Sequence, residues 1–197
     1  IGYLLFGQED GWPEVVDLAD LSNVPHILFK TDLTDTRHGM MGASAIPMGD
    51  LNGDNIDDFM VSASFYGAEV IGTEEPFGSG EAYLVFGRSS WLTDAGEDLT
   101  ITIDELHTDY AITFKGQMEF GMLGSNMANL GDINGDGLID VALSEATETD
   151  LVDPYGRVHI LFGNSDWSPA QIGSVFNLDA INNDSGLKHT LLTSGSD

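Results

Sequence analysis

The chain has no cysteine and very few basic residues. Without cysteine it can form no disulfide and carry out no thiolate chemistry. Its six Lys and Arg residues stand against 33 Asp and Glu residues, which gives a formal net charge of −27. A surface of that sign repels phosphate backbones, so we expect no nucleic-acid partner. No stretch approaches the roughly 18 apolar residues of a membrane span, so we expect no membrane insertion by this segment.

Two short acidic segments repeat one another at an offset of 82 residues. Both have oxygen-bearing side chains at positions 1, 3, 5 and 9, and glycine at position 4. Calcium takes about 6–8 oxygen ligands, and a loop with oxygens at alternate positions can direct them inward. The spacing therefore predicts two Ca²⁺ sites, each with the position-7 backbone carbonyl as a further ligand. The expected ligands are Asp50, Asn52, Asp54, Ile56 and Asp58 in the first loop, and Asp132, Asn134, Asp136, Leu138 and Asp140 in the second.

These loops differ from an EF-hand in the residues that come after them. An EF-hand has a bidentate Glu at position 12 and continues into a helix. Here position 12 is Val61 or Leu143, and the next runs of residues are short and apolar, as in buried strands. We therefore expect inter-strand loops in which Asp58 and Asp140 replace the glutamate. The alternative is an Asp/Asn/Gly turn without metal, which two identical ligand sets disfavour.

The repetition extends to strands that end in Phe-Gly. Gly80–Gly87 matches Gly156–Gly163, and Ile1–Gly7 is a third copy. Together with the runs around the acidic loops, this makes four short strands in a unit of roughly 80 residues, which is typical of a β-propeller blade. The expected fold class is all-β, with blades of four antiparallel strands and calcium-binding inter-strand loops. The recurring tryptophans, which we expect to be packing anchors, are Trp12, Trp91 and Trp167.

These motifs resemble the FG-GAP repeat of the integrin α-subunit β-propeller. Gly49–Asp58 and Gly131–Asp140 match its calcium loop. The chain departs from the pattern at the Gly-Ala-Pro element, which is Ser62–Ser64 or Ser144–Ala146, and at His38, where the family has Phe. In that family the calcium loops lie on the face opposite the usual ligand face. The resemblance thus implies that both calcium ions are structural.

The alignment divides the chain into about two and a half blades. Residues 1–37 would supply the last two strands of one blade, 38–119 a complete blade, and 120–197 another. A closed propeller typically needs 4–8 blades, and an incomplete one exposes apolar blade faces. We therefore expect either a fragment of a longer chain, with further blades elsewhere in it, or copies that assemble to complete a ring.

An extracellular location is expected, with the chain secreted or held at a cell surface, and a bacterial source. Sites with three carboxylates and no bidentate glutamate match the weak range of extracellular modules, roughly 10⁻⁴–10⁻³ M. A solvated acidic surface also suits saline surroundings, where salt screens its self-repulsion. This favours a marine or halophilic organism.

No catalytic motif for a nucleophilic serine, a catalytic zinc or a phosphate-binding loop occurs, so we expect no enzyme, and structural roles for the five histidines. The long loop at 65–80 contains Phe65, Tyr66 and Phe77 and is the best candidate for contact with a protein or carbohydrate ligand. The alternative is an insertion packed over its own blade. The function favoured is a binding or adhesion module. Two alternatives stay open: an accessory propeller of a large secreted enzyme, polysaccharide-degrading or phospholipase-like, and a self-assembling component of an extracellular ring or filament.

Overall fold

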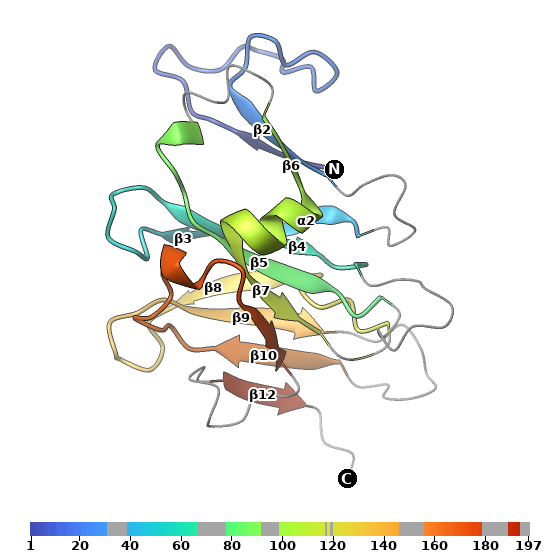
Figure 1. Ribbon diagram of the computed structural model, residues 1–197, viewed down its shortest axis with the longest axis vertical. Coiled ribbons are helices and arrows are strands. Elements are labelled where there is room, and N and C mark those ends of the chain that lie inside the picture. Colours follow the sequence, from blue (N-terminus) through green and yellow to red (C-terminus); the bar gives the residue numbers. More distant parts are fainter. Residues whose placement is uncertain are drawn as a thin grey trace.

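Three β-sheets are stacked along the long axis of the molecule in the computed structural model, in the order of the chain (Figure 1). The structure describes residues 1–30, 39–66, 78–91, 99–116, 118, 120–145, 156–178 and 189–193, without the side chains of His189 and Thr193. Each sheet is open, and antiparallel pairs predominate. The all-β fold expected from the sequence is confirmed.

The first sheet has three strands in the order β1-β2-β6. β1 and β2 are antiparallel, with Leu4 opposite Ile27. β6 comes much later in the chain and runs parallel to β2, with Ile101 opposite Phe29. One edge of β1 is left at the outside of the sheet. The strands are β1 Gly2–Leu5, β2 His26–Lys30 and β6 Thr100–Thr102.

The middle sheet has five strands in the order β11-β7-β5-β4-β3. The four strands from β3 to β7 are antiparallel, as expected for one repeat. The fifth, β11, was not expected; it runs parallel to β7, with Phe176 opposite Phe114. The strands are β3 Met41–Gly49, β4 Asp58–Ala63, β5 Glu81–Val85, β7 Ala111–Lys115 and β11 Val175–Asn177.

The third sheet is antiparallel throughout, in the order β12-β10-β9-β8. Its register repeats that of the middle sheet. Gly131 lies opposite Asp140 after an irregularity in β8, as Gly49 lies opposite Asp58 after one in β3. The strands are β8 Met127–Gly131, β9 Asp140–Glu145, β10 Arg157–Leu161 and β12 His189–Thr193.

The hydrophobic core lies in two layers, one on each face of the middle sheet. Alternate residues of a strand point to opposite faces, so β5 sends Tyr83 and Val85 to the layer beside the first sheet and Ala82 and Leu84 to the layer beside the third. All five residues of β5 are buried. A strand that is covered on both faces needs a continuous apolar run, as β5 has from Ala82 to Val85.

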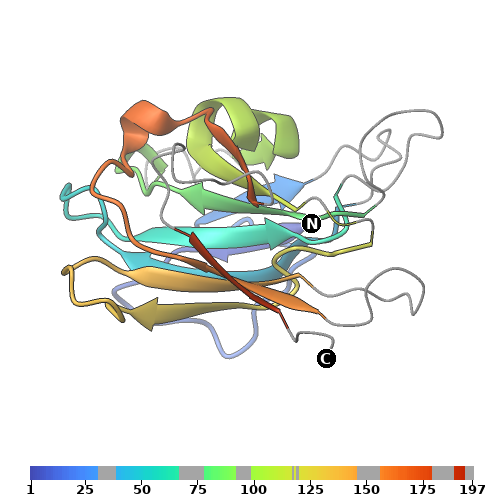
Figure 2. The same ribbon diagram turned by 90° about the horizontal axis from the view of Figure 1, so that it is seen from below.

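Short helical segments lie on one side of the stacked sheets (Figure 2). The first begins at Thr102, whose hydroxyl accepts the amide of Glu105 while the Glu105 carboxylate accepts the amide of Thr102. This reciprocal capping box satisfies two amides at the helix start. The segments are α2 Ile103–Glu105, the π-helical turn η2 Leu106–Tyr110 and the 3-10 turn η3 Pro169–Gln171.

Candidate metal centres and the polar clusters beside them

The first acidic loop closes around the side chain at its position 1. The Asp50 carboxylate accepts hydrogen bonds from the amides of Gly53, Asp54 and Asn55, at 2.7, 3.0 and 2.8 Å. Side chains two positions further on continue the pattern. The amide of Asp54 donates to Asn52 Oδ1, and the amide of Ile56 donates to Asp54 Oδ1, each at 2.9 Å. The side-chain oxygens at positions 1, 3 and 5 therefore all accept hydrogen bonds from backbone amides of the same loop.

The second acidic loop makes the same hydrogen bonds at an offset of 82 residues. Asp132 accepts the amides of Gly135, Asp136 and Gly137, at 2.6, 3.0 and 2.8 Å. Positions 4 and 6 of both loops are in the left-handed region, which glycine and asparagine tolerate best. Their φ angles are 78° at Gly53, 64° at Asn55, 81° at Gly135 and 87° at Gly137.

Position 9 of each loop is a buried aspartate that joins the loop to a Phe-Gly strand. Asp58 is 1% exposed; its Oδ1 accepts the amide of Gly87 at 2.8 Å and its Oδ2 the amide of Leu51 at 2.9 Å. Asp140 is 0% exposed. Its two oxygens accept the amides of Gly163 at 2.7 Å and Ile133 at 2.9 Å. The two repeated motifs of the sequence, acidic loop and Phe-Gly strand, thus meet at one buried carboxylate in each repeat.

The loop packs so closely on the Phe-Gly strand that only glycine fits there. A Cβ on Gly87 would lie 2.4 Å from the carbonyl oxygen of Asp57, and one on Gly163 would lie 2.5 Å from Leu138 Cβ. Gly7 ends the third Phe-Gly strand, and no atom of the described residues beyond its chain neighbours lies within 4 Å of its Cβ position. In the described part of the chain, the first sheet therefore has the Phe-Gly strand without a loop packed against it.

Burial and hydrogen bonds shift the pKa values of the loop carboxyls in opposite directions. Burial raises the pKa of Asp58; the amides of Gly87 and Leu51 oppose this shift, and the charges of Asp54 and Asp50 add to it. The exposed Asp132 has a lowered pKa, because the amides of its own loop donate to its charged form, led by that of Gly137. A dense set of carboxylates beside a buried one is an arrangement that a bound cation would stabilise.

The loop oxygens fit a hard cation by type and by remaining acceptor capacity. An ionised carboxylate offers about four acceptor positions. Asp50 uses three for amides, Asp58 two and Asp54 one. Within the described parts of the chain, however, no three His, Asp or Glu side chains form a ready-made metal cluster. Calcium binding therefore stays a prediction.

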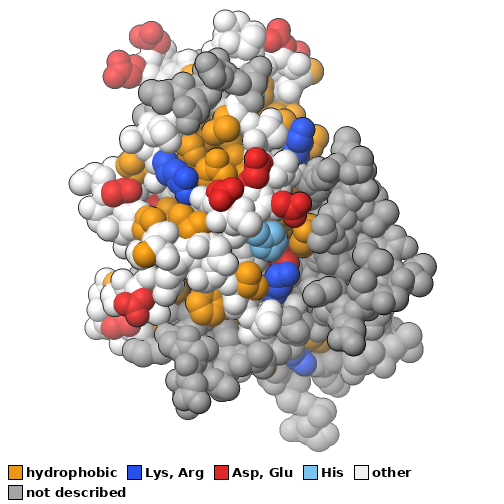
Figure 3. Space-filling model, in the orientation of Figure 1, with side chains coloured by type: hydrophobic (Ala, Val, Ile, Leu, Met, Phe, Trp, Pro, Cys, Tyr) orange, Lys and Arg blue, Asp and Glu red, His pale blue; other side chains and the backbone are white. Residues whose placement is uncertain are grey.

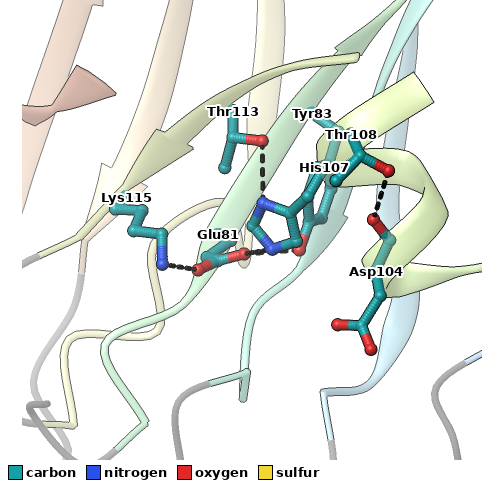
Figure 4. A network of polar contacts seen from close by, with 7 residues as sticks. All are labelled: Glu81, Tyr83, Asp104, His107, Thr108, Thr113 and Lys115. Carbon is teal, nitrogen blue, oxygen red and sulfur yellow. Dashed lines mark hydrogen bonds and ion pairs between the residues drawn. The ribbon is translucent and has the colours of Figure 1, made fainter. Parts of the chain in front are cut away.

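A second polar cluster lies beside β5, and its residues were not predicted from the sequence (Figure 4). The buried Glu81 carboxylate contacts His107 Nε2 at 2.9 Å, Lys115 Nζ at 2.9 Å and the Tyr83 hydroxyl at 2.5 Å. His107 Nδ1 lies 3.2 Å from the Thr113 hydroxyl. Burial alone would raise the pKa of Glu81, but the hydrogen bonds and charges of these partners lower it below its ordinary value. Burial and the Glu81 charge raise the pKa of Tyr83 well above its ordinary value.

The third sheet also has a buried acid, Glu145, but it lies on β9 and not on the Phe-Gly strand. Glu145 on β9 and His159 on β10 are both 0% exposed, and Glu145 Oε2 lies 2.8 Å from His159 Nε2. Glu145 also accepts the amide of Met118 at 3.2 Å, in the segment that leads from the middle sheet to the third. In the middle sheet Glu81 lies opposite Ala63, and in the third Arg157 lies opposite Glu145. At this cross-strand pair, the middle sheet has its acid on β5 and the third sheet has its acid on β9.

The predicted partner residues divide between surface and core. Phe65 is partly buried. Tyr66 is only 3% exposed, and its ring lies 6.0 Å from that of His107, so little of it is left for a partner. Phe77 lies outside the described residues, as does His38. Of the tryptophans, Trp91 and Trp167 are buried packing residues as expected, whereas Trp12 is 46% exposed.

The comparisons with known proteins agree with this β-rich picture at a modest level. No protein-family model matches the chain. Human integrin alpha-8 is 28% identical to it over 159 residues, which is 81% of the chain and 13% of the integrin. The chain therefore spans a small part of that relative. Among the described residues no helix is long and apolar enough to cross a membrane.

Proposed function

We propose that the chain is a calcium-stabilised segment of an integrin-like β-propeller, and that it serves as a non-catalytic binding or adhesion module of an extracellular protein. One observation carries the proposal. Two acidic loops with the same hydrogen bonds are each anchored by a buried aspartate to a Phe-Gly glycine. The similarity to integrin alpha-8 over most of the chain supports the same interpretation.

The proposed role of calcium is structural. Each loop holds several carboxylates close together, and their mutual repulsion opposes the folded loop when no cation is present. A Ca²⁺ ion bound by the folded loop alone stabilises the fold by mass action. Because Asp58 and Asp140 also bind the Phe-Gly strands, calcium at positions 1, 3, 5, 7 and 9 would stiffen the junction between two strands as well as the loop.

The proposed arrangement of repeats corresponds to the sheets. The middle sheet, without β11, corresponds to the blade expected at 38–119, and the third sheet to the blade expected at 120–197. β1 and β2 correspond to the last two strands of a preceding blade within 1–37. Further blades, in the same chain or in other copies, would complete the propeller. The ligand would be a protein or a carbohydrate, bound by loops away from the calcium loops.

Removal of calcium tests the proposal. The melting temperature should fall when excess EGTA is added and recover when Ca²⁺ is restored in excess. The matched control is the double variant Asp50→Ala/Asp132→Ala, which should melt at the same temperature with and without EGTA. A wild-type melting curve that EGTA leaves unchanged would show that the loops are metal-free turns.

A further inference from the structure

An apolar groove of about 560 Å³ lies between the first and middle sheets. Leu4 and Phe6 form one wall, and the other is formed by β3 and β4 residues and by Trp91. On the face seen in Figure 3, apolar side chains gather at the level of this junction. The groove opens beside β1, whose free edge has no partner strand among the described residues. Unpaired strand edges beside apolar surface are sites where another strand can add.

The first and middle sheets share one register over three strands. In the middle sheet Ala82 pairs with Phe114, and Phe114 with Phe176. In the first sheet Gly2 pairs with Phe29, and Phe29 with Ile101. β1, β2 and β6 therefore correspond residue by residue to β5, β7 and β11. Among the described residues, the first sheet has no counterparts of β3 and β4.

The next interface shows what fills such a groove. Between the middle and third sheets, the corresponding space holds Met48 of β3 and Met60 of β4, both 0% exposed. On the far side of the middle sheet, β1 is only partly buried, whereas its counterpart β5 is buried throughout. The apolar side chains that would cover β1 are thus the counterparts of those on β3 and β4.

The position of Gly7 indicates where a counterpart of β4 would begin beside β1. Its counterparts Gly87 and Gly163 each donate an amide hydrogen bond to the aspartate that begins β4 or β9. Each also touches the loop before that aspartate, whereas the Cβ position of Gly7 is open. An aspartate-led strand in the groove would place its carboxylate at the Gly7 amide and its loop against the Gly7 α-carbon.

We propose that the groove and the β1 edge form a docking site for an extended strand of a further repeat of the same kind, which begins with an aspartate at the end of an acidic loop and carries apolar residues at alternate positions. It would run antiparallel to β1, as β4 does to β5. A second copy of the chain is a poorer occupant, because its own β4 and β9 are already paired on both edges. The inference rests on the repeat arrangement proposed above but not on its calcium.

The test uses a fluorescent synthetic peptide with the sequence of residues 50–63, measured by fluorescence anisotropy against the 197-residue chain. The peptide should bind saturably, and a scrambled peptide of equal composition should not. Gly7→Ala should weaken binding by roughly tenfold or more, because the added methyl group meets the loop of the peptide. It should leave the melting temperature of the chain unchanged, since the position is open. The matched variant Leu192→Asp alters the edge strand β12 and should not change binding.

A fused version removes dependence on the affinity of a short peptide. The same sequence is joined ahead of Ile1 by a flexible Gly/Ser linker, which raises its effective concentration. The fusion should raise the melting temperature over that of the scrambled fusion, and Gly7→Ala should cancel the gain. The proposal is wrong if the free peptide does not bind and the fused strand does not raise the melting temperature. It is also wrong if Gly7→Ala changes neither the binding nor the melting temperature of the fusion. A dimer in light scattering that Gly7→Ala dissociates would assign the groove to a second copy instead. An EGTA-insensitive melting curve would refute the calcium sites and leave this result intact.

Discussion

The buried carboxylate of Asp58 accepts a hydrogen bond from the amide of Gly87, 29 residues later in the chain. This bond connects the last residue of an acidic loop to the glycine of a Phe-Gly strand. The same bond recurs in the third sheet. Two motifs that are separate in sequence are therefore one structural unit, and substitutions at either end should have related effects.

Replacing Asp58 should destabilise the fold more than replacing its exposed neighbour. Asp58→Ala leaves the amides of Gly87 and Leu51 without their acceptor in a buried place, at a cost of about 3 kcal/mol in the free energy of unfolding. Asp57→Ala removes an exposed carboxylate and should change stability by less than about 0.5 kcal/mol. Urea denaturation in EGTA measures both, so that metal binding does not contribute. Equal effects would show that the buried bonds contribute nothing.

The glycine end of the unit should be just as sensitive. Gly163→Ala places a methyl group 2.5 Å from Leu138 Cβ and 2.7 Å from the carbonyl oxygen of Ile139. Because backbone atoms must move to make room, we expect a loss of about 1–3 kcal/mol in the free energy of unfolding. Gly7→Ala is the control with the same chemical change at an open position. Equal melting temperatures for Gly163→Ala and Gly7→Ala would contradict the close packing at Gly163.

Each acidic loop should account for one calcium ion. Asp132→Ala removes the side chain that accepts three loop amides and is a predicted ligand. Equilibrium dialysis should then find one bound Ca²⁺ per chain instead of two, and Asp50→Ala should give the same result. The variant Asp17→Asn, outside both loops, should keep two. If both sites persist in Asp132→Ala, the ligand assignment is wrong.

Stability should depend on pH through Glu81. Its pKa is lowered in the folded state, so its contribution is complete above the unfolded value, about 4.3, and is lost as the pH falls through the lower folded value. Wild type should exceed Glu81→Gln by about 2 kcal/mol at pH 7, and the gap should shrink below about pH 4. Urea denaturation across this range measures it, with the exposed Glu9→Gln as control. A gap that is constant with pH would mean that the charge of Glu81 is not the source of the effect.

Glu145, the buried acid of the third sheet, should contribute to stability through both its charge and its volume. Glu145→Ala removes the carboxylate beside His159 and leaves space against Gly116 and Gly121, whose Cβ positions lie 2.8 Å from Glu145 Oε1. Losing one partner of a buried pair costs about 3–5 kcal/mol. Circular dichroism melts should show this loss, whereas Glu14→Ala at an exposed position should melt like wild type. A small change would indicate that the pair and its packing are nearly neutral.

The sequence predicted the parts of this structure that depend on local pattern. Repeated residues account for the Phe-Gly strands, for the strands around the acidic loops and for the offset of 82 residues between those loops. The parallel strands β6 and β11 were missed because three residues carry too little periodicity and their partners lie far away in sequence. Glu81 was missed because acids are abundant in this chain, and only the fold brings it to His107 and Lys115. Trp12 was expected to be a packing anchor by analogy with Trp91 and Trp167, but it is 46% exposed.

The parallel strands also determine when each sheet can be finished. A ribosome makes a chain from its N-terminal to its C-terminal end, yet the first sheet receives its third strand from residues 100–102 and the middle sheet its fifth from residues 175–177. Each of these sheets therefore keeps one strand edge unpaired until part of the next repeat has left the ribosome. Synthesis that stalls between the two would release a nascent chain with an exposed strand edge, a state that favours aggregation.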